Sequence, residues 1–280
     1  MDGFPAFRRA RALLIASHPG PSLAITALTT LLAAQAAPHG TGPVLVAPAM
    51  LAGQLSIGWS NDACDARRDA AAGRRDKPLT AGEISTRAVW IAALTALAAS
   101  LAMSLAISVA TAIIDAVMLA SGWAYNLGLK STLWSGVMYL AGFGLIPAYA
   151  ASTLPGHPAP RWSVTVAAGL VGLGAHFTNE LPDLAAAKAT GVNGLPQQVA
   201  NRWGAAAVRA VALVLLLSAS VLLVLAASGS RRWVAVAGLG AAGLLAVACG
   251  RGSGRLPFLA AIGIAAIDVV LFAAGGEALT

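Results

Sequence analysis

The sequence predicts an all-α integral membrane protein, and three observations support this fold class. The chain of 280 residues is 58% hydrophobic and 10% charged, with a mean hydropathy of +0.76, whereas a soluble domain carries about 25% charged residues. Apolar runs near the ~20 residues that cross a bilayer recur along the whole chain. Two acid-rich motifs each follow such a run, and no composition shift indicates a separate soluble domain.

Nine apolar runs account for most of the sequence, so we expect nine transmembrane helices packed as a bundle in one domain, 1–280. The stretch 86–127 is divided into two spans because it is about twice the length of one. Links rich in Pro, Gly and His, such as 38–43 and 154–158, predict short turns. The runs are 20–37, 44–59, 88–106, 107–126, 133–153, 164–177, 205–227, 234–249 and 256–274.

The basic residues lie unequally on the two sides of this predicted bundle. With the N-terminus inside, all but three of the 18 Lys and Arg residues face the cytoplasm, the exceptions being Arg161, Arg231 and Arg232. Under the positive-inside rule this asymmetry places both acidic motifs at the cytoplasmic face of a multi-pass cell-membrane protein. Because the net charge of +7 records topology in this way, we expect no nucleic-acid partner.

The chain ends and the cysteines add little chemistry. Residues 1–14 have no convincing signal-peptidase site, so we interpret them as a retained amphipathic lead-in to the first span. Cys64 and Cys249 are the two cysteines, and their surroundings suggest neither a disulfide nor a zinc site.

The first acidic motif contains three aspartates spaced i, i+3 and i+7. Asp62, Asp65 and Asp69 share one face of a helix at this spacing. Carboxylates gathered at the end of an apolar run need a cation, and their oxygen atoms suit Mg²⁺. Asn61 can add a carbonyl oxygen. The alternative is a solvated loop whose capping aspartates pair with nearby arginines.

The second acidic motif repeats the pattern N-[DE]-x-x-D far downstream, in Asn179, Glu180 and Asp183. In both motifs a glycine follows eight residues after the last acid of this pattern, at Gly73 and Gly191, and a Leu/Pro pair comes next. Such internal similarity predicts two related halves, roughly 1–130 and 131–280, with the chemistry between them.

Basic residues near the motifs exceed what the acids need for neutralisation, particularly once Mg²⁺ is added. This surplus fits an anionic ligand such as diphosphate, which arginine and lysine bind differently. The alternative is anchoring to lipid headgroups, which we favour for Arg8, Arg9, Arg251 and Arg255. The surplus residues are Arg67, Arg68, Arg74, Arg75, Lys77, Lys130 and Lys188.

The two motifs resemble those of the UbiA superfamily of intramembrane prenyltransferases. The run GWSNDACDARRDAAAGRRDKPLTAGEIS closely resembles the first motif of that superfamily, N-D-x-x-D-x-x-x-D, with its basic-Pro-Leu continuation. The run NELPDLAAAKATGVNGLP resembles the second motif and the glycine after it. Nine helices, with motifs after the second and the sixth, also match that superfamily, so the resemblance covers essentially the whole chain.

The resemblance implies a central apolar cavity with a polar cytoplasmic cap. Asp62, Asp65 and Asp69 would bind Mg²⁺-diphosphate from one side, and Glu180 and Asp183 from the other. The groups implied for the diphosphate are Asn61, Arg67, Arg68, Lys77, Lys130, Asn179 and Lys188. The chain departs from the superfamily at Ala187, where another aspartate is usual, and at Glu180, where aspartate is usual.

Other polar and aromatic residues are expected to line the cavity. Asp115 either faces an acceptor or pairs with another helix, and His176 is either a proton acceptor or a packing residue. Trp59, Tyr125 and Tyr139 would line an isoprenoid tunnel and stabilise an allylic cation. Asp268 is interpreted as a structural pair, and His18, His39 and His157 as turn residues.

The function expected from these residues is Mg²⁺-dependent ionisation of a polyprenyl diphosphate and transfer of the prenyl group to an acceptor, an aromatic or other lipid-soluble small molecule. An alternative within the same superfamily is a terpene cyclase that needs no acceptor. A transporter would also carry acids within its helices, but paired motifs at one face argue against it. The sequence indicates neither the prenyl chain length nor the oligomeric state.

Overall fold

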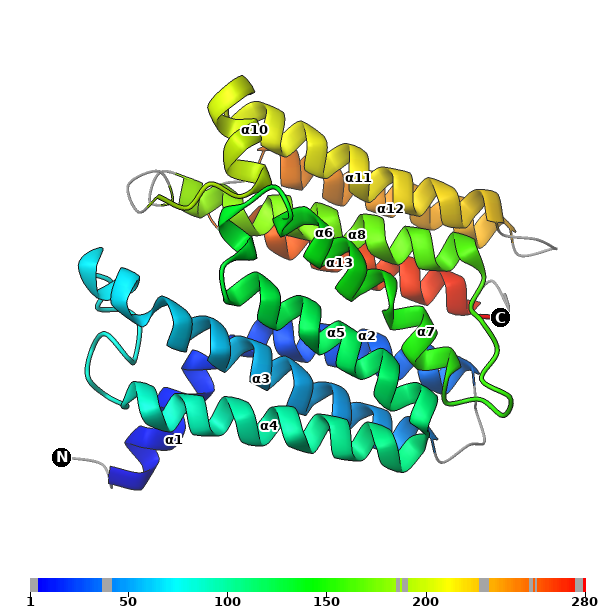
Figure 1. Ribbon diagram of the computed structural model, residues 1–280. Coiled ribbons are helices and arrows are strands. Elements are labelled where there is room, and N and C mark those ends of the chain that lie inside the picture. The colour runs from blue at the N-terminus through cyan, green and yellow to red at the C-terminus, as the bar shows by residue number, and fades with distance from the viewer. Residues whose placement is uncertain are drawn as a thin grey trace.

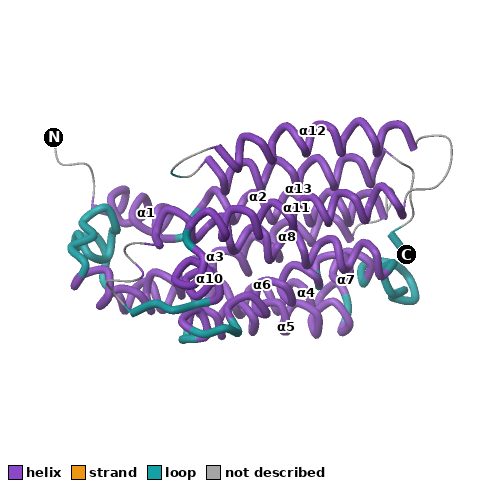
Figure 2. The backbone as a smooth tube through the Cα atoms, turned by 90° about the horizontal axis from the view of Figure 1, so that it is seen from above, coloured by secondary structure: helices purple, strands orange, loops and turns teal. Residues whose placement is uncertain are grey.

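The computed structural model describes residues 5–36, 42–184, 187, 191–226, 232–251, 254, 256–274 and 279–280, and within these residues every regular element is a helix. The long helices lie side by side along one direction (Figure 1), and α1 and the last described residues lie at opposite ends of the bundle (Figure 2). The all-α fold class predicted from the sequence is therefore confirmed.

The first half of the chain forms five helices, among them a long helix that carries the first acidic motif. These are α1 (Pro5–Ala16), α2 (Pro19–Ala36), α3 (Gly42–Ala71), α4 (Thr86–Ile107) and α5 (Val109–Asn126). Helix α3 continues for 30 residues through the motif, so the aspartates are fixed to the same rigid element as the apolar run before them.

The expected division of 86–127 into two helices is confirmed, and Ser108 explains where it falls. Ser108 has extended backbone angles, ends α4 and begins α5. Its hydroxyl oxygen accepts a hydrogen bond from the Thr111 backbone N–H at 3.0 Å, which satisfies a donor that the helix start leaves unpaired. Ser85 caps α4 in the same way, accepting from the Ala88 N–H at 3.2 Å.

The second half of the chain is more broken than the sequence indicates. The expected span over 133–153 is divided at Leu145, because Pro147 lacks a backbone N–H to continue the helix. The short helix after the second motif was not among the predicted runs. The elements are η1 (Leu129–Ser131), α6 (Ser135–Gly144), α7 (Ile146–Ala151), α8 (Trp162–Glu180), η2 (Leu181–Asp183), α10 (Leu195–Trp203), α11 (Ala205–Ala226), α12 (Arg232–Arg251) and α13 (Leu256–Ala274).

The buried core consists mainly of two clusters, one on each side of the bundle. The first cluster joins α2, α3, α5 and α7 through residues such as Met50, Met118 and Tyr149. The second joins α8, α11, α12 and α13 through Leu216 and Ile264, among many alanines. Small residues let these helices approach closely, as membrane helices commonly do.

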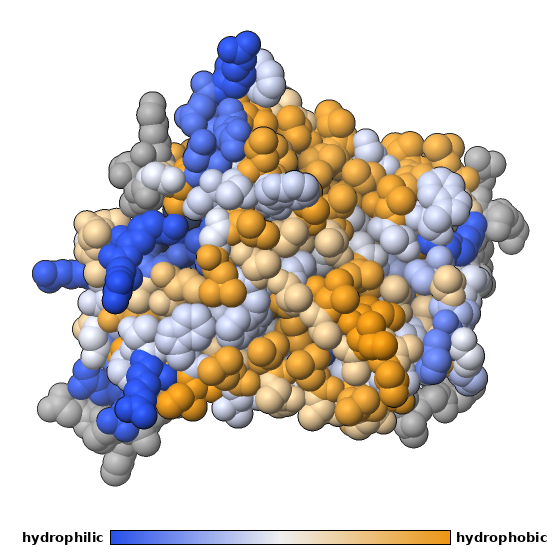
Figure 3. All heavy atoms as spheres, viewed as in Figure 1, coloured by the Kyte–Doolittle hydropathy of each residue, from blue (hydrophilic) through white to orange (hydrophobic). Residues whose placement is uncertain are grey.

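On the face seen in Figure 3, apolar side chains cover much of the middle of the bundle, and the largest hydrophilic groups gather at the end that carries α10 and the end of α3. By length and composition, two described helices, α4 and α11, could each cross a membrane, and the α1–α2 pair, bent by 66°, would be a third if counted as one span. Shorter apolar helices lie at Ser135–Ala151, Val236–Val247 and Leu256–Asp268. The number of spans thus stays a prediction.

Candidate active site

The three aspartates of the first motif lie on one face of the last turns of α3, and each contacts a cationic side chain. Asp62, which is only 2% exposed, contacts Lys77. The Lys77 Nζ atom also lies 3.8 Å from Asp69 Oδ2. Asp65 contacts both Lys130 and Arg68. Because buried carboxylates without partners are strongly destabilising, these cations stabilise the face of three aspartates.

Lys77 returns to α3 because the chain reverses directly after the helix. Gly73 has a φ of +69°, a left-handed conformation that favours glycine, and the Arg74 N–H donates to the Asp69 carbonyl at 3.0 Å. Gly191, the equivalent glycine after the second motif, also has a positive φ, +75°. The two positions matched by sequence spacing therefore share a positive φ.

Lys130 comes from η1 and is held in place by the segment that follows the second motif. A Cβ atom on Gly194 would lie 2.4 Å from the Lys130 carbonyl oxygen, so only glycine permits this approach. Next to it, the Leu195 N–H donates to Ser135 Oγ at 2.9 Å. Lys130 is 8% exposed. Burial lowers the pKa of Lys130, although the charge of Asp65 acts in the opposite direction.

Asn61 is oriented by a side chain of α5. Its Nδ2 donates to Asn126 Oδ1 at 3.0 Å, and Asn126 Nδ2 donates in turn to the Ile57 carbonyl and to Ser60 Oγ, at 2.9 and 2.8 Å. This arrangement engages the amide nitrogen of Asn61 and leaves its carbonyl oxygen as the group that can face a cation. Sequence reasoning did not single out Asn126.

The second motif is held by neutral donors. Glu180, at the end of α8, accepts from Tyr125 OH at 3.1 Å and from Gln197 Nε2 at 2.6 Å. Asn179 and Asp183 are exposed. The charge of Lys130 acts on Glu180, and that of Asp183 acts on Arg74 in the loop after α3. The two motifs therefore face one another electrostatically across the same end of the bundle.

A cluster of rings lies beside Glu180. Tyr139 stacks on His176 with ring centroids 4.4 Å apart, and Tyr125 meets both rings edge-on at 5.2 and 5.6 Å. His176 Nε2 lies 3.0 Å from Ser135 Oγ, while its buried Nδ1 has no hydrogen-bond partner among the described residues. The structure thus brings together three of the residues expected to line the cavity.

Two other expected cavity residues lie elsewhere. The Trp59 indole N–H donates to the Leu13 carbonyl at 2.8 Å, and its ring packs against the cluster around α1 instead of against the tyrosines. Asp115 accepts from Ser100 and Ser104 hydroxyls of α4, each at 2.9 Å. It therefore joins α5 to α4, which is the pairing alternative considered from the sequence.

His18 lies in the turn between α1 and α2, as the sequence predicted, but it is not an ordinary turn residue. Its Nε2 lies 2.9 Å from Asp62 Oδ1. The only sequence signal was its place in a His-Pro-Gly-Pro break between two helical segments. Gln197 was also missed, although it directly follows the Leu195-Pro196 pair that repeats the continuation of the first motif. His39 and Lys188 lie outside the described residues.

The remaining groups expected to bind the diphosphate differ in their availability. Arg68 is engaged by Asp65, whereas Arg67 is exposed. Among the residues that the structure describes, no group of three or more carboxylate, histidine and cysteine side chains is arranged to hold one metal ion. The available donors are nevertheless oxygen atoms on α3, the type that Mg²⁺ prefers when phosphate oxygens complete its coordination. The aspartates of α3 therefore fit a Mg²⁺ ion whose remaining ligands are phosphate oxygens.

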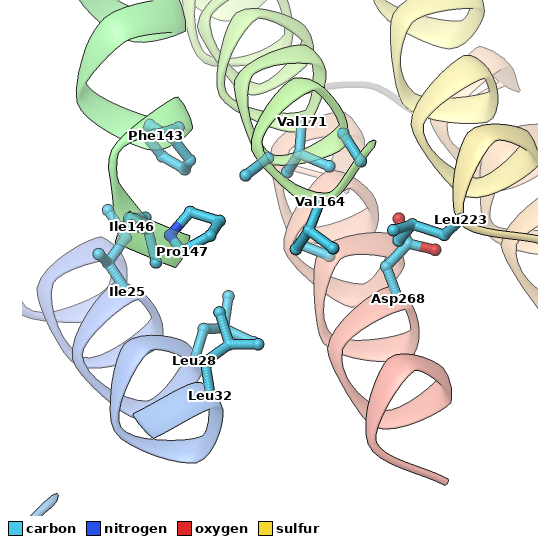
Figure 4. A pocket seen from close by; sticks show the side chains of 13 residues that line it. Ile25, Leu28, Leu32, Phe143, Ile146, Pro147, Val164, Val171, Leu223 and Asp268 are labelled. Carbon is cyan, nitrogen blue, oxygen red and sulfur yellow. The ribbon is translucent and has the colours of Figure 1, made fainter. Parts of the chain in front are cut away.

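An apolar pocket lies between α2, α6, α7, α8, α11 and α13 (Figure 4). Residues such as Ile25, Phe143 and Val171 line it, together with Asp268. Asp268 Oδ2 accepts from Ser220 Oγ at 3.2 Å, which agrees with the structural pairing expected for it. An apolar chain could lie in this pocket.

Comparison with known proteins identifies a family and several solved structures that are similar to this chain. The model of the UbiA prenyltransferase family matches residues 22–268, whereas a search of curated proteins found no match. A UbiA homolog from Archaeoglobus fulgidus bound to GPP and Mg²⁺ is 19% identical, with a TM-score of 0.73 over 95% of this chain and 98% of that chain.

Two further solved structures are similar. The Archaeoglobus fulgidus homolog bound to DMAPP and Mg²⁺ is 19% identical, with a TM-score of 0.71 over 94% and 97% of the two chains. The apo structure of a UbiA homolog from Aeropyrum pernix K1 is 15% identical, with a TM-score of 0.70 over 91% and 96%. At these identities the structures show a shared fold. Because the family match extends over most of the chain and includes both acidic motifs, the protein belongs to the UbiA prenyltransferase family.

Proposed function

We propose that this protein is a Mg²⁺-dependent intramembrane prenyltransferase that ionises a polyprenyl diphosphate and transfers the prenyl group to an aromatic or other lipid-soluble acceptor. The observation that carries the proposal is the face of Asp62, Asp65 and Asp69, matched by Lys77 and Lys130 at one end of an apolar bundle. The family match supports it, as do the similar structures bound to GPP or DMAPP with Mg²⁺.

The polar residues would bind the diphosphate and stabilise its departure. Lys77, Lys130 and Arg68, which pair with carboxylates, would turn toward phosphate oxygens. Bound Mg²⁺ would supply Lewis-acid stabilisation of the leaving group. As the C–O bond breaks, its electron pair leaves with the diphosphate, whose added charge the ammonium and guanidinium groups stabilise.

The apolar residues would hold the prenyl chain. The rings of Tyr125 and Tyr139 lie beside Glu180, where they can stabilise an allylic cation by cation–π attraction. The pocket between α2 and α13 would take more distant carbons of the chain. The acceptor then forms the new bond to the allylic carbon and loses a proton to the medium or to a nearby base.

A terpene cyclase is the second candidate, and the second motif is compatible with it. Glu180 is occupied by Tyr125 and Gln197, and Ala187 supplies no carboxylate. The allylic cation would then be captured by a double bond of its own chain. Purified protein should be incubated with prenyl diphosphates of several lengths, with and without acceptors, while diphosphate release and products are measured.

The outcomes separate the candidates. Release that requires an acceptor, with a prenylated product, supports the transferase. Release without an acceptor, with a cyclic hydrocarbon or alcohol as product, supports the cyclase. No release from any prenyl diphosphate, under conditions in which the protein keeps its helical content, contradicts both.

We further propose a multi-pass cell-membrane protein with nine spans, one domain of two related halves, and its polar site at the cytoplasmic face. The positive φ of both Gly73 and Gly191 supports the proposal of two related halves. In a variant without Cys64 and Cys249, a cysteine placed at exposed Ala71 should be labelled only from the cytoplasm, and one at exposed Ala159 only from outside. Labelling of both from one face contradicts this topology.

A further inference from the structure

The turn between α1 and α2 packs directly against the first motif. His18 has a φ of +51°, which is uncommon for a residue other than glycine. A Cβ atom on Gly58 would lie 2.4 Å from the Ser17 carbonyl oxygen, so the turn rests on the bare backbone of α3. Gly58 lies four residues, about one helical turn, before Asp62.

Two further hydrogen bonds fix the turn in this position. Ser22 Oγ donates to the Ser17 carbonyl at 2.9 Å, and the Trp59 indole N–H donates to the Leu13 carbonyl at 2.8 Å. Ser17 is fully buried. The backbone just before His18 is therefore held against α3 at Leu13 and Ser17, and the Ser22 hydrogen bond closes the turn on the other side of His18.

His18 and Lys77 both contact the same oxygen of Asp62. His18 Nε2 lies 2.9 Å from Oδ1, and Lys77 Nζ contacts Oδ1 as well, while no described residue hydrogen-bonds to Oδ2. Lys77 comes from a loop on a flexible side chain that can follow a ligand, whereas His18 is a short side chain on a fixed turn. His18 is thus the contact that sets the rotation of the Asp62 carboxylate.

We infer that His18 is a positioning residue, which holds Asp62 by Oδ1 so that Oδ2 faces the Mg²⁺-diphosphate of the substrate. The inference rests on the proposed function. Groups that orient a metal ligand typically contribute about 10- to 100-fold in metal affinity or activity. The His18 side chain is 42% exposed, so replacing it removes little buried area and should leave the fold intact.

The test compares His18→Phe, which keeps a ring without a hydrogen bond, with His18→Gln, whose amide can donate to Asp62 at a similar reach. The measurements are Mg²⁺-dependent binding of a prenyl thiodiphosphate that does not ionise readily, the Mg²⁺ concentration for half-maximal turnover, and the melting temperature without ligand. His18→Phe should raise both the dissociation constant and the half-maximal Mg²⁺ concentration by about 10-fold or more. His18→Gln should recover most of this loss.

The chain offers a matched control in His157. It also has a left-handed φ, +47°, it is exposed, and its Nδ1 lies 2.7 Å from the Ser152 carbonyl oxygen, in the loop between α7 and α8 at the opposite end of the bundle (Figure 1). His157→Phe should leave binding and Mg²⁺ dependence unchanged, whatever it does to the melting temperature.

Unchanged binding and Mg²⁺ dependence in His18→Phe would overturn the inference while leaving the proposed function intact. So would a His18→Gln variant as defective as His18→Phe, because the hydrogen bond would then be irrelevant. If the wild-type protein binds no prenyl thiodiphosphate at any Mg²⁺ concentration, the proposed function itself fails, and the role of His18 fails with it.

Discussion

The two acidic motifs occupy the same end of the bundle, yet they are built differently. Asp62 and Asp65 of the first motif lie on a continuous helix and contact cations. Glu180 of the second motif lies where a helix ends and contacts the neutral donors Tyr125 and Gln197. Asp183 is exposed on a short 3-10 turn. The carboxylates of the first motif are therefore held in ion pairs whose cations a metal ion can replace. Glu180 of the second motif is held by hydrogen bonds that a ligand would have to break.

This difference indicates that the two motifs contribute unequally to binding the metal and the diphosphate. Replacing the ammonium partners of the first motif with Mg²⁺ would keep its carboxylates paired with cations, and Gly194 of the second half packs against the backbone of Lys130. Recruiting Glu180 instead requires that two neutral donors find other acceptors. We therefore expect substitutions in the first motif to have the larger effects.

The largest effect is expected at Asp65. Asp65→Ala should lower turnover by about 10³-fold or more, which corresponds to about 4 kcal/mol of lost transition-state stabilisation, because it removes an oxygen ligand and leaves Lys130 without its partner. The control is Glu83→Gln, at a surface pair with Arg11, which should behave as wild type. Helical content by circular dichroism should be unchanged in both. Full wild-type activity in EDTA would contradict the role of the motif.

A smaller loss is expected when the cation that both halves position is removed. Lys130→Met should lower turnover by about 10²-fold, since a buried charge-assisted contact to the leaving group is lost. Arg67→Met, at an exposed position of the same motif, should raise the Michaelis constant by only a few-fold. Steady-state kinetics of both variants would show whether a buried cation contributes more to turnover than an exposed one. Equal effects would mean that the site attracts its ligand by overall charge alone.

Glu180→Gln sharpens the comparison between the motifs. Glutamine retains a carbonyl oxygen for one of the two donors but removes the carboxylate charge, so turnover should fall by about 10-fold and less than in Asp65→Asn. The two variants should be measured side by side at saturating Mg²⁺. A Glu180→Gln variant as inactive as Asp65→Asn would show that the two motifs contribute equally.

The smallest expected effect is a gain at Ala187, which is 6% exposed. Ala187→Asp should lower the Mg²⁺ concentration for half-maximal activity by a few-fold, because an added oxygen ligand raises affinity for a hard cation. The titration should be run with Ala187→Asn, which adds similar bulk without the charge. If neither variant changes Mg²⁺ dependence or products, residue 187 points away from the site.

Much of the helical framework could be predicted because it follows from local sequence. The division at Ser108 and the face of Asp62, Asp65 and Asp69 depend on helix length and spacing. The contact between His18 and Asp62 could not be predicted, since it requires a turn 44 residues earlier to pack on Gly58. The position of Trp59, away from the tyrosines, could not be predicted for the same reason. Trp59 packs against α1, and hydrophobic periodicity does not indicate which helix α1 packs against.

The single-residue connection at Ser108 also fixes the rotational phase of α5. One inserted residue there would rotate α5 by about 100° about its axis relative to α4. Tyr125 and Asn126, which reach Glu180 and Asn61, would then turn toward other neighbours. The connection at Ser108 thus sets the direction of side chains at the opposite, polar end of the bundle. We therefore expect that a residue inserted or deleted at Ser108 would disrupt the site, although Ser108 is not part of it.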